Sequence, residues 1–153
     1  MAPETEEAGR KGEQAQLPGG VRGAEELAGF IRDGYSGKVV EVGVGLRPEV
    51  ARLCRPLQLL ATDKESRILS GVRVVKDDIF SPALEVYSGA SLIYSIRPPL
   101  EVQQAMGELA KKVSCDMLIR PLGDEIADLP GFSRILINRG WARFYLYKLK
   151  SEV

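Results

Sequence analysis

The sequence predicts an α/β fold in which a doubly wound, mostly parallel sheet ends in a C-terminal antiparallel hairpin. Short apolar runs without polar alternation take turns with amphipathic segments, which is typical of strands buried on both faces by helices. The apolar run 39–42 ends in two glycines, as happens where a parallel strand turns into a helix. Towards the C-terminus the rhythm changes to two adjacent strand-like runs, which indicates a hairpin.

Each expected element rests on its own apolar pattern. The first helix is expected over residues 24–33, where Leu27, Phe30 and Ile31 form an i, i+3, i+4 stripe that can pack on a sheet. Similar stripes predict two further helices, over 49–55 and 102–113. The apolar runs predict strands at 39–42, 57–62, 72–75, 90–96 and 117–119, followed by hairpin strands at 133–138 and 141–149.

The last strand and the loop before the hairpin carry two further expectations. Apolar residues fall on both faces of 141–149, beginning with Trp141, which favours a place inside the sheet rather than at its edge. Segment 122–132 holds Gly123, Pro130 and Gly131 and hardly allows a full helix. One face of the sheet should then be thinly covered, and we expect the chain to self-associate there.

Composition excludes several classes of protein and of chemistry. The chain has 153 residues and a formal net charge of zero, so no global field draws it to nucleic acid or to an anionic membrane. It contains no histidine, which removes Ser-His-Asp and Cys-His catalysis and most transition-metal sites, and we expect no metal. Its two cysteines, Cys54 and Cys115, form no CxxC pair and suggest a reducing compartment.

Domain organisation and location follow from the same composition. Residues 1–23 are rich in Glu, Gly, Gln and Ala and indicate a disordered tail, which leaves 24–153 as a single domain. No apolar run approaches the roughly 20 residues of a membrane span, and the polar N-terminus is unlike a signal peptide. We therefore expect a cytoplasmic protein.

A candidate cofactor site lies where the first strand ends. Glu41 stands two residues before Gly43, and Gly45 follows after one more residue. Glycine permits positive φ and lets a ligand approach the backbone closely. An acid in this position favours S-adenosylmethionine over a dinucleotide, because a carboxylate can meet the cofactor's ammonium group directly or through water.

Further acids follow the next two strands. Asp63 ends the second strand, where an acid is placed to hold ribose hydroxyls. Asp77 and Asp78 follow the third strand, where an acid can accept the adenine amino group beside the apolar Ile79 and Phe80. Ligands bind open parallel sheets at the carboxyl ends of the strands, so these acids and the two glycines should lie at one edge.

Taken together, residues 24–149 resemble a class I S-adenosylmethionine-dependent methyltransferase, which implies a Rossmann-like fold. In that resemblance Glu41 and the two glycines match the first motif, Asp63 the ribose acid, and Asp77 or Asp78 the adenine-side acid. More narrowly, the chain is similar to a small uncharacterised archaeal family with a truncated version of this fold, in which the run 94–99 would be a hallmark. The narrower resemblance implies the fold better than the activity.

Two departures from the motif leave other functions open. The frequent third glycine is replaced by Arg47, which adds positive charge near a cofactor whose sulfonium is already positive. A nicotinamide-binding domain would want glycine at position 48, where this chain has Pro48. We keep two alternatives, an NAD-binding Rossmann domain and a catalytically inactive nucleotide-binding or interaction module. In a purely structural interpretation the glycines only make a tight turn, while Asp63 and Asp78 end strands or cap helices.

Three arginines are expected at the same edge. Arg97 and Arg120 each end a strand within an Ile-Arg-Pro echo, and Arg47 follows the first strand. The proline after Arg97 and after Arg120 favours extended backbone at the arginine. Guanidinium groups suit phosphate and carboxylate, so the crevice could take an anionic substrate or a nucleic-acid backbone. Equally, the arginines could only pair with nearby acids such as Asp116 or Asp124.

No residue is singled out as catalytic. The pair 98–99 is similar to the Asn/Asp-Pro-Pro-aromatic motif of amino-group methyltransferases, but the flanking acid or amide and the aromatic are missing. Methyl transfer is an in-line displacement that positioning can accelerate, so a base is sometimes dispensable. The candidate bases near the crevice are Tyr94, Ser95, Asp124 and Glu125, of which Tyr94 fits a core position better.

Overall fold

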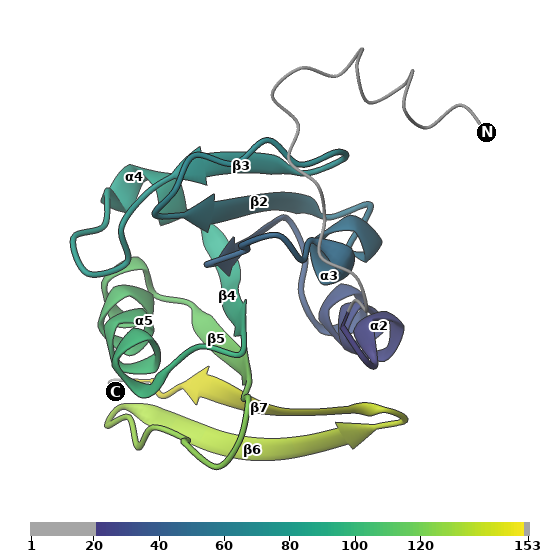
Figure 1. The fold of residues 1–153 in the computed structure, drawn as a ribbon. Helices are drawn as coiled ribbons and strands as arrows, with labels where there is room; N and C mark the ends of the chain where they lie inside the picture. The colour runs from purple at the N-terminus through teal and green to yellow at the C-terminus, as the bar shows by residue number, and fades with distance from the viewer. Residues whose placement is uncertain (1–20, 152–153) are drawn as a thin grey trace, which may run out of the picture.

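At the centre of the sheet lie β1 (Lys38–Val42) and β4 (Ala90–Ile96), paired in parallel in a computed structural model that describes residues 21–151. The strand order is β3-β2-β1-β4-β5-β7-β6 (Figure 1). The other strands are β2 (Gln58–Asp63), β3 (Arg73–Lys76), β5 (Asp116–Arg120), β6 (Phe132–Arg139) and β7 (Ala142–Leu149). Strands β1 to β5 run parallel, whereas β7 is antiparallel to both β5 and β6. The predicted α/β class, with a doubly wound and mostly parallel Rossmann-like sheet ending in a hairpin, is confirmed.

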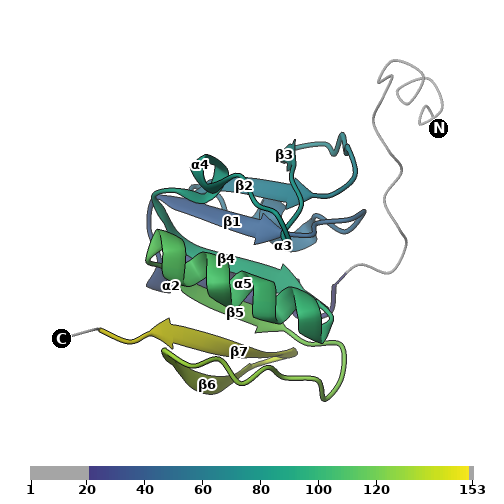
Figure 2. The same ribbon diagram turned by 90° about the vertical axis from the view of Figure 1, so that its left-hand side faces the viewer.

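Helices cover both faces of this sheet (Figures 1 and 2). One face carries α2 (Ala24–Gly34) and α3 (Glu49–Leu53), and the other carries α4 (Leu84–Tyr87) and α5 (Leu100–Val113). The predicted stripe of α2 is buried in the core of its face, and the apolar side of α5 is buried in the opposite core. Full burial of one large apolar side chain is worth about 1.5–3 kcal/mol, so these two cores provide most of the favourable free energy.

Strand β1 contributes to both cores in alternation. Val40 and Val42 belong to the core beneath α5, whereas Val39 belongs to the core beneath α2 and α3. Successive residues of a strand point to opposite faces, so Glu41 shares the side of Val39. The fold therefore buries a carboxyl group in a mainly apolar core beside α3.

Strand β7 lies inside the sheet, between β5 and β6, as its two apolar faces predict. Phe144 belongs to the core on the α2 side and Tyr147 to the core on the α5 side. The sequence also assigns Trp141 to this strand, and that assignment is wrong. The last hairpin pair is Arg139 with Ala142, so Trp141 lies in the two-residue turn and is 66% exposed.

The connection between β5 and β6 forms no helix in the described chain, as the sequence predicts. A buried amide fixes this loop, residues 121–131, to the rest of the domain. Gln103 on α5 donates from Nε2 to the carbonyl of Glu125 at 2.8 Å, and its Oε1 accepts the N–H of Ala127 at 2.8 Å. The Tyr147 hydroxyl donates to the carbonyl of Ala127 at 2.7 Å. The loop is thus held by hydrogen bonds from both α5 and β7.

The predicted tail, residues 1–23, lies almost wholly outside the described residues, so the boundary of the domain stays a prediction. The chain is already packed at Val21, whose side chain belongs to the core on the α2 side. Within residues 21–151, no helix combines the length and the apolar character needed to cross a bilayer.

Candidate functional site

The strand order reverses between β1 and β4, because the chain builds outward through β2 and β3 and then returns to the other side of β1. Open α/β sheets bind ligands in the crevice at the carboxyl ends of the strands, at this switch point. The structure brings the two predicted glycines to the end of β1, Asp63 to the end of β2, and Arg97 to the residue after β4. The carboxyl edge of the sheet is therefore the candidate site.

The glycine loop at the end of β1 has left-handed backbone at both glycines, with φ of 71° at Gly43 and 57° at Gly45. A Cβ added at Gly45 would meet nothing within 4 Å, and one at Gly43 would meet only the Ser95 Oγ at 4.0 Å. Backbone angles, and not crowding, require glycine here. The space that each Cβ would enter is open, which suits close approach of a ligand.

Backbone hydrogen bonds hold the loop on the neighbouring strands. The N–H groups of Gly43 and Val44 donate to the carbonyl of Thr62, at 2.8 and 3.1 Å. The Ser95 hydroxyl donates to the carbonyl of Val42 at 2.7 Å, which ties β4 to the same turn. The open loop is thus rigidly positioned between β2 and β4.

Asp63 is bonded to the glycine loop itself. One carboxylate oxygen accepts the N–H of Gly45 at 3.0 Å. The other accepts the N–H of Glu65 at 3.0 Å and the Nε–H of Arg67 at 3.1 Å. Each carboxylate oxygen can accept about two hydrogen bonds, so Oδ1 retains acceptor capacity. The predicted bond to ribose hydroxyls stays a prediction, and the bonds observed here stabilise the loop.

The two acids after β3 differ in accessibility. Asp77 accepts the Tyr87 hydroxyl at 2.6 Å and the N–H of Ala83 at 3.0 Å, and burial together with this bond raises the pKa of Tyr87. Asp78 is exposed, and its carboxylate accepts the N–H of Phe80 at 2.9 Å. Of the two, Asp78 is the better placed to accept a hydrogen bond from a ligand.

An apolar hollow lies beside Asp78. It measures about 240 Å³ and is formed between the segment after β3 and α5. Its lining residues are Ile79, Phe80, Pro82, Ala105, Glu108, Leu109 and Lys112. The apolar neighbours that the sequence predicts beside the adenine-side acid are therefore present, although their role is untested.

Glu41 is fully buried, so direct contact with a ligand would require its side chain to move. The Tyr94 hydroxyl donates to Glu41 Oε1 at 2.7 Å, and Oε2 has no hydrogen-bond partner among the described residues. Burial raises the pKa of Glu41 to about 8, the bond from Tyr94 opposes this rise, and the charge of Glu49 adds to it. The carboxyl group behind the glycine loop is therefore mostly protonated at neutral pH. The predicted contact with a cofactor's ammonium group stays a prediction.

Both thiols are buried and unreactive. Burial raises the pKa of Cys54 and of Cys115 to about 12. A thiolate is the reactive form of cysteine, so neither residue can act as a nucleophile or base near neutral pH.

Two of the three predicted arginines come together at the carboxyl edge. The N–H of Arg97 donates to the carbonyl of Arg120 at 2.7 Å, and burial together with the charge of Arg97 lowers the pKa of Arg120. Arg47 lies in the glycine loop instead, where its N–H donates to the carbonyl of Val44 at 3.3 Å. Asp116, the proposed partner, is engaged by Lys148 at 3.1 Å. Within residues 21–151 the guanidinium groups of Arg97 and Arg120 form no ion pair.

The backbone of Arg97 differs from the expectation. Proline at the next position favours extended geometry, but Arg97 has φ of 57°, in the left-handed region. Its N–H donates to the carbonyl of Arg120, which continues the β4–β5 ladder by one bond, and the left-handed residue then leads out of the strand toward α5. Left-handed backbone at a residue other than glycine costs roughly 1–2 kcal/mol.

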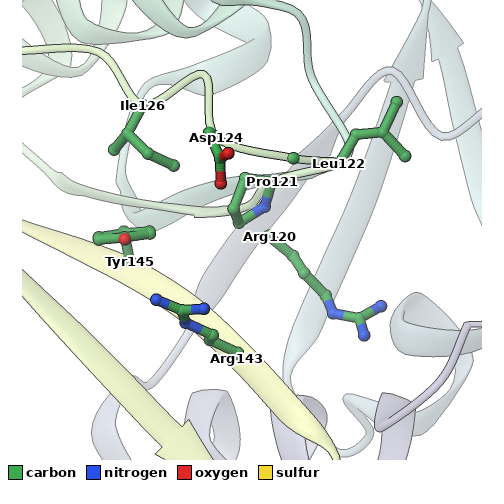
Figure 3. A pocket seen from close by; sticks show the side chains of 8 residues that line it. Arg120, Pro121, Leu122, Asp124, Ile126, Arg143 and Tyr145 are labelled. Atoms are coloured by element: carbon green, nitrogen blue, oxygen red, sulfur yellow. The ribbon is translucent and has the colours of Figure 1, made fainter.

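A pocket of about 340 Å³ opens beside the end of β5 (Figure 3). It is lined by Arg120, Pro121, Leu122, Gly123, Asp124, Ile126, Arg143 and Tyr145. Figure 3 shows Asp124, Tyr145 and Arg143 around one hollow, with the Arg120 side chain extending on the other side of Pro121. Neither Arg143 nor Tyr145 is among the site residues that the sequence predicts. Alternation along β7 puts both on one face, and that signal could have found them.

The strand order defines the fold: a truncated, Rossmann-like fold of the kind found in class I methyltransferases. The chain belongs to the uncharacterised protein family UPF0146, whose profile matches residues 24–149. A UPF0146 protein of Archaeoglobus fulgidus is 43% identical over 126 residues, which make up 80% of this chain and 93% of that relative.

Solved structures of methyltransferases share the fold at low sequence identity. The putative methyltransferase yhhF from Escherichia coli has a TM-score of 0.56 and 12% identity, with 90% of this chain and 92% of that chain covered. The glycopeptide N-methyltransferase MtfA, solved with S-adenosylmethionine, has a TM-score of 0.52 and 10% identity, with 91% and 81% covered. At these identities the likeness shows a common fold.

Proposed function

We propose that this protein binds S-adenosylmethionine at the glycine loop and is a methyltransferase for an anionic small molecule or nucleic acid. The observation that carries the proposal is the open space above Gly43 and Gly45, whose left-handed backbone stands at the switch point of the sheet. Further support comes from the fold, since one protein that shares it was solved with this cofactor.

The residues at the edge fit such a cofactor. The glycine loop would admit its methionine and ribose parts close to the backbone, Asp63 would accept from the ribose hydroxyls, and Asp78 would accept from the adenine amino group. When bound, the cofactor supplies a methyl group on a cationic sulfur, which an acceptor takes by in-line displacement. The chain's own part is to position both partners and to exclude water.

A catalytically inactive binding module is the second candidate. The Tyr94 hydroxyl is engaged by Glu41, and the Ser95 hydroxyl by the carbonyl of Val42. Of the candidate bases, only Asp124 and Glu125 are exposed. If the methyl acceptor must be deprotonated by a strong base, this edge provides only exposed carboxylates for that task. Binding of a ligand without catalysis needs no base. An NAD-binding domain is the third candidate, and the same experiment tests it.

Two further proposals concern the state of the protein. We propose that copies of the chain associate over the face of the sheet that the helix-free segment 122–132 leaves thinly covered, where Leu122 is exposed. Sedimentation that shows a monomer at high concentration would remove this idea. We also propose a cytoplasmic location, supported by two free thiols, Cys54 and Cys115.

A titration of the ¹⁵N-labelled protein with S-adenosylmethionine, S-adenosylhomocysteine and NAD tests the proposed cofactor. We expect both adenosyl compounds to shift the amide resonances of Gly43, Gly45 and Asp78 in a saturable way, and NAD to leave them in place. If saturating S-adenosylmethionine moves none of these resonances, the loop is only a turn. Transfer of a tritiated methyl group to cell extract then separates an enzyme from a binding module.

A pair of glycine variants separates ligand contact from backbone strain. Gly37 precedes β1, has φ of 71° and also has nothing within 4 Å of an added Cβ. Gly37→Ala and Gly45→Ala should each cost roughly 1–2 kcal/mol in stability, because both force alanine into left-handed backbone. Only Gly45→Ala should weaken S-adenosylmethionine binding, by tenfold or more. Equal affinity in both variants would remove the glycine loop from the cofactor site.

A further inference from the structure

We infer that the pocket between the end of β5 and β7 binds a small organic oxyanion that also carries a hydrogen-bond donor, such as an amino or hydroxyl group. Arg143 would hold its phosphate or carboxylate, and Asp124 and Tyr145 would hold the donor end. Arg120, whose side chain extends past Pro121, would add positive charge at the rim. The inference rests on the proposed function only in taking this ligand as the methyl acceptor; the binding itself is independent of any cofactor.

The pocket lies where the sheet lacks a helix. Arg143 and Tyr145 belong to the face of β7 that looks toward α5, since Tyr145 packs against the core on that side. The opposite wall is the loop after β5, which Gln103 and Tyr147 fix through hydrogen bonds to Ala127. The hollow therefore has one wall in a strand and another in a loop held by buried bonds, as a pre-formed ligand site requires.

The positive charges around this pocket lack acidic partners. Within the described part of the chain, neither Arg120 nor Arg143 forms an ion pair, and Arg97 next to them forms none. Arg134, on the neighbouring strand, is different: it contacts Asp128 at 3.3 Å and donates to the carbonyl of Ala127 at 3.2 Å. The chain neutralises the arginine that supports the pocket and leaves those at its rim available for an anion.

The other polar groups define what else the ligand carries. Asp124 and Arg143 both line the hollow, yet no ion pair joins them, and Figure 3 shows the hollow between them. A bare anion would be repelled by the Asp124 carboxylate, so the ligand should present a donor there. Tyr145 is held in place by the Arg134 guanidinium, 5.7 Å from its ring centroid. A zwitterion or a hydroxylated acid satisfies both ends of the pocket.

Size and charge favour a small molecule over nucleic acid. The volume of about 340 Å³ lies at the lower end of the range for small-ligand pockets, roughly 300–1,000 Å³. The chain's formal net charge is zero, which provides little of the long-range attraction on which nucleic-acid binding depends. The N–H of Arg97, at the end of β4, donates to the carbonyl of Arg120, so the pocket begins one strand away from the switch point.

The test compares two phosphate probes that differ only at the donor end. Phosphoethanolamine carries a phosphate and an amine, whereas ethyl phosphate carries the phosphate alone. We expect phosphoethanolamine to shift the side-chain Nε–H resonances of Arg120 and Arg143 in a saturable way and to bind at least fivefold tighter than ethyl phosphate. In Asp124→Asn the two probes should bind equally. Serine in place of phosphoethanolamine reports whether carboxylate serves as well as phosphate.

Charge variants provide the matched control. Arg143→Gln should weaken phosphoethanolamine binding at least tenfold, and Arg120→Gln should weaken it less, because Arg120 acts only from the rim. Arg73→Gln, on β3 at the opposite edge of the sheet, should leave it unchanged. Arg143 is exposed, and an unchanged melting temperature of Arg143→Gln would show that its fold is intact. Linear, unsaturable shifts, or equal affinity in all three variants, would overturn the inference. So would a single-stranded oligonucleotide that displaces the probe with a steep salt dependence.

The two proposals fail separately. Phosphoethanolamine binding without S-adenosylmethionine binding would retain the pocket and remove the proposed methyltransferase. The reverse result would retain the cofactor site and overturn the inference drawn from the pocket.

Discussion

On the β1–β3 half of the carboxyl edge the acids are bonded to the chain itself, whereas on the β4–β7 half the arginines have no acidic partner among the described residues. Asp63 and Asp77 accept hydrogen bonds from the loops around them. Arg97 lies close to Arg120, and Arg120 and Arg143 line one pocket. The acids of the first half are thus satisfied by the chain itself, whereas the arginines of the second half are available to an anion.

This difference indicates which charged groups contribute to the stability of the fold and which are available to bind a ligand. Like charges held together without a counter-ion raise the free energy of the folded state, so such a cluster indicates binding more than stability. A partnered acid indicates the opposite, because its hydrogen bonds already stabilise the loop that it holds. Substitution of the partnered acids on the glycine half should therefore act mainly on stability, and substitution of the arginines that line the pocket mainly on binding.

The largest effect should come from Gln103, which holds the wall of the pocket. Gln103→Leu leaves the carbonyl of Glu125 and the N–H of Ala127 without their buried partner, and we expect a loss of about 3–4 kcal/mol in the free energy of unfolding. Urea unfolding measures it. The adjacent Gln104 is exposed on the same helix, and Gln104→Leu should change stability by less than about 0.5 kcal/mol. Similar losses in both would show that the loop is not held by this amide.

Glu41 tests the glycine half through its pH dependence. Its pKa is raised to about 8 in the folded chain from the ordinary value of 4.5, so the folded state binds the proton more tightly. The stability that this proton confers is complete below pH 4.5 and is lost as pH rises towards 8, at up to about 1.4 kcal/mol per pH unit.

Glu41→Gln mimics the protonated form and should lose less stability over this range. We expect the variant to gain about 3–4 kcal/mol on the wild type between pH 5 and pH 8, as measured by urea unfolding at both values. Glu85→Gln, on α4, serves as the control. Parallel pH profiles for wild type and Glu41→Gln would mean that the buried carboxyl is ionised throughout.

The smallest effect concerns the strained backbone of Arg97. Arg97→Gly relieves both the left-handed strain and the repulsion on Arg120, whereas Arg97→Ala relieves only the repulsion. We expect the glycine variant to be more stable than the alanine variant by about 0.5–1 kcal/mol, with thermal melting as the measurement. An alanine variant of equal stability would place the strain elsewhere. Both variants should weaken an anion bound at Arg120, which separates binding from stability on this half.

The sequence reveals the two halves to different degrees. The glycine half is a local motif on consecutive strand ends, so the sequence could predict Gly43, Gly45 and their acids together. The ion pair between Asp63 and Arg67 could not be predicted, because it depends on the conformation of the turn after β2. On the other half, the repeated Ile-Arg-Pro motif was enough to predict that Arg97 and Arg120 lie at neighbouring strand ends. The position of Arg143 could not be predicted, because it depends on an antiparallel strand that enters the sheet beside β5.

The same strand order dictates how the domain can assemble. β6 contacts the sheet only through β7, although β7 follows it in the chain. During synthesis β6 emerges before β7, so it can join the sheet only after β7 has followed it. The pocket likewise gains its strand wall only with β7, which makes the proposed anion site depend on the last strand of the chain.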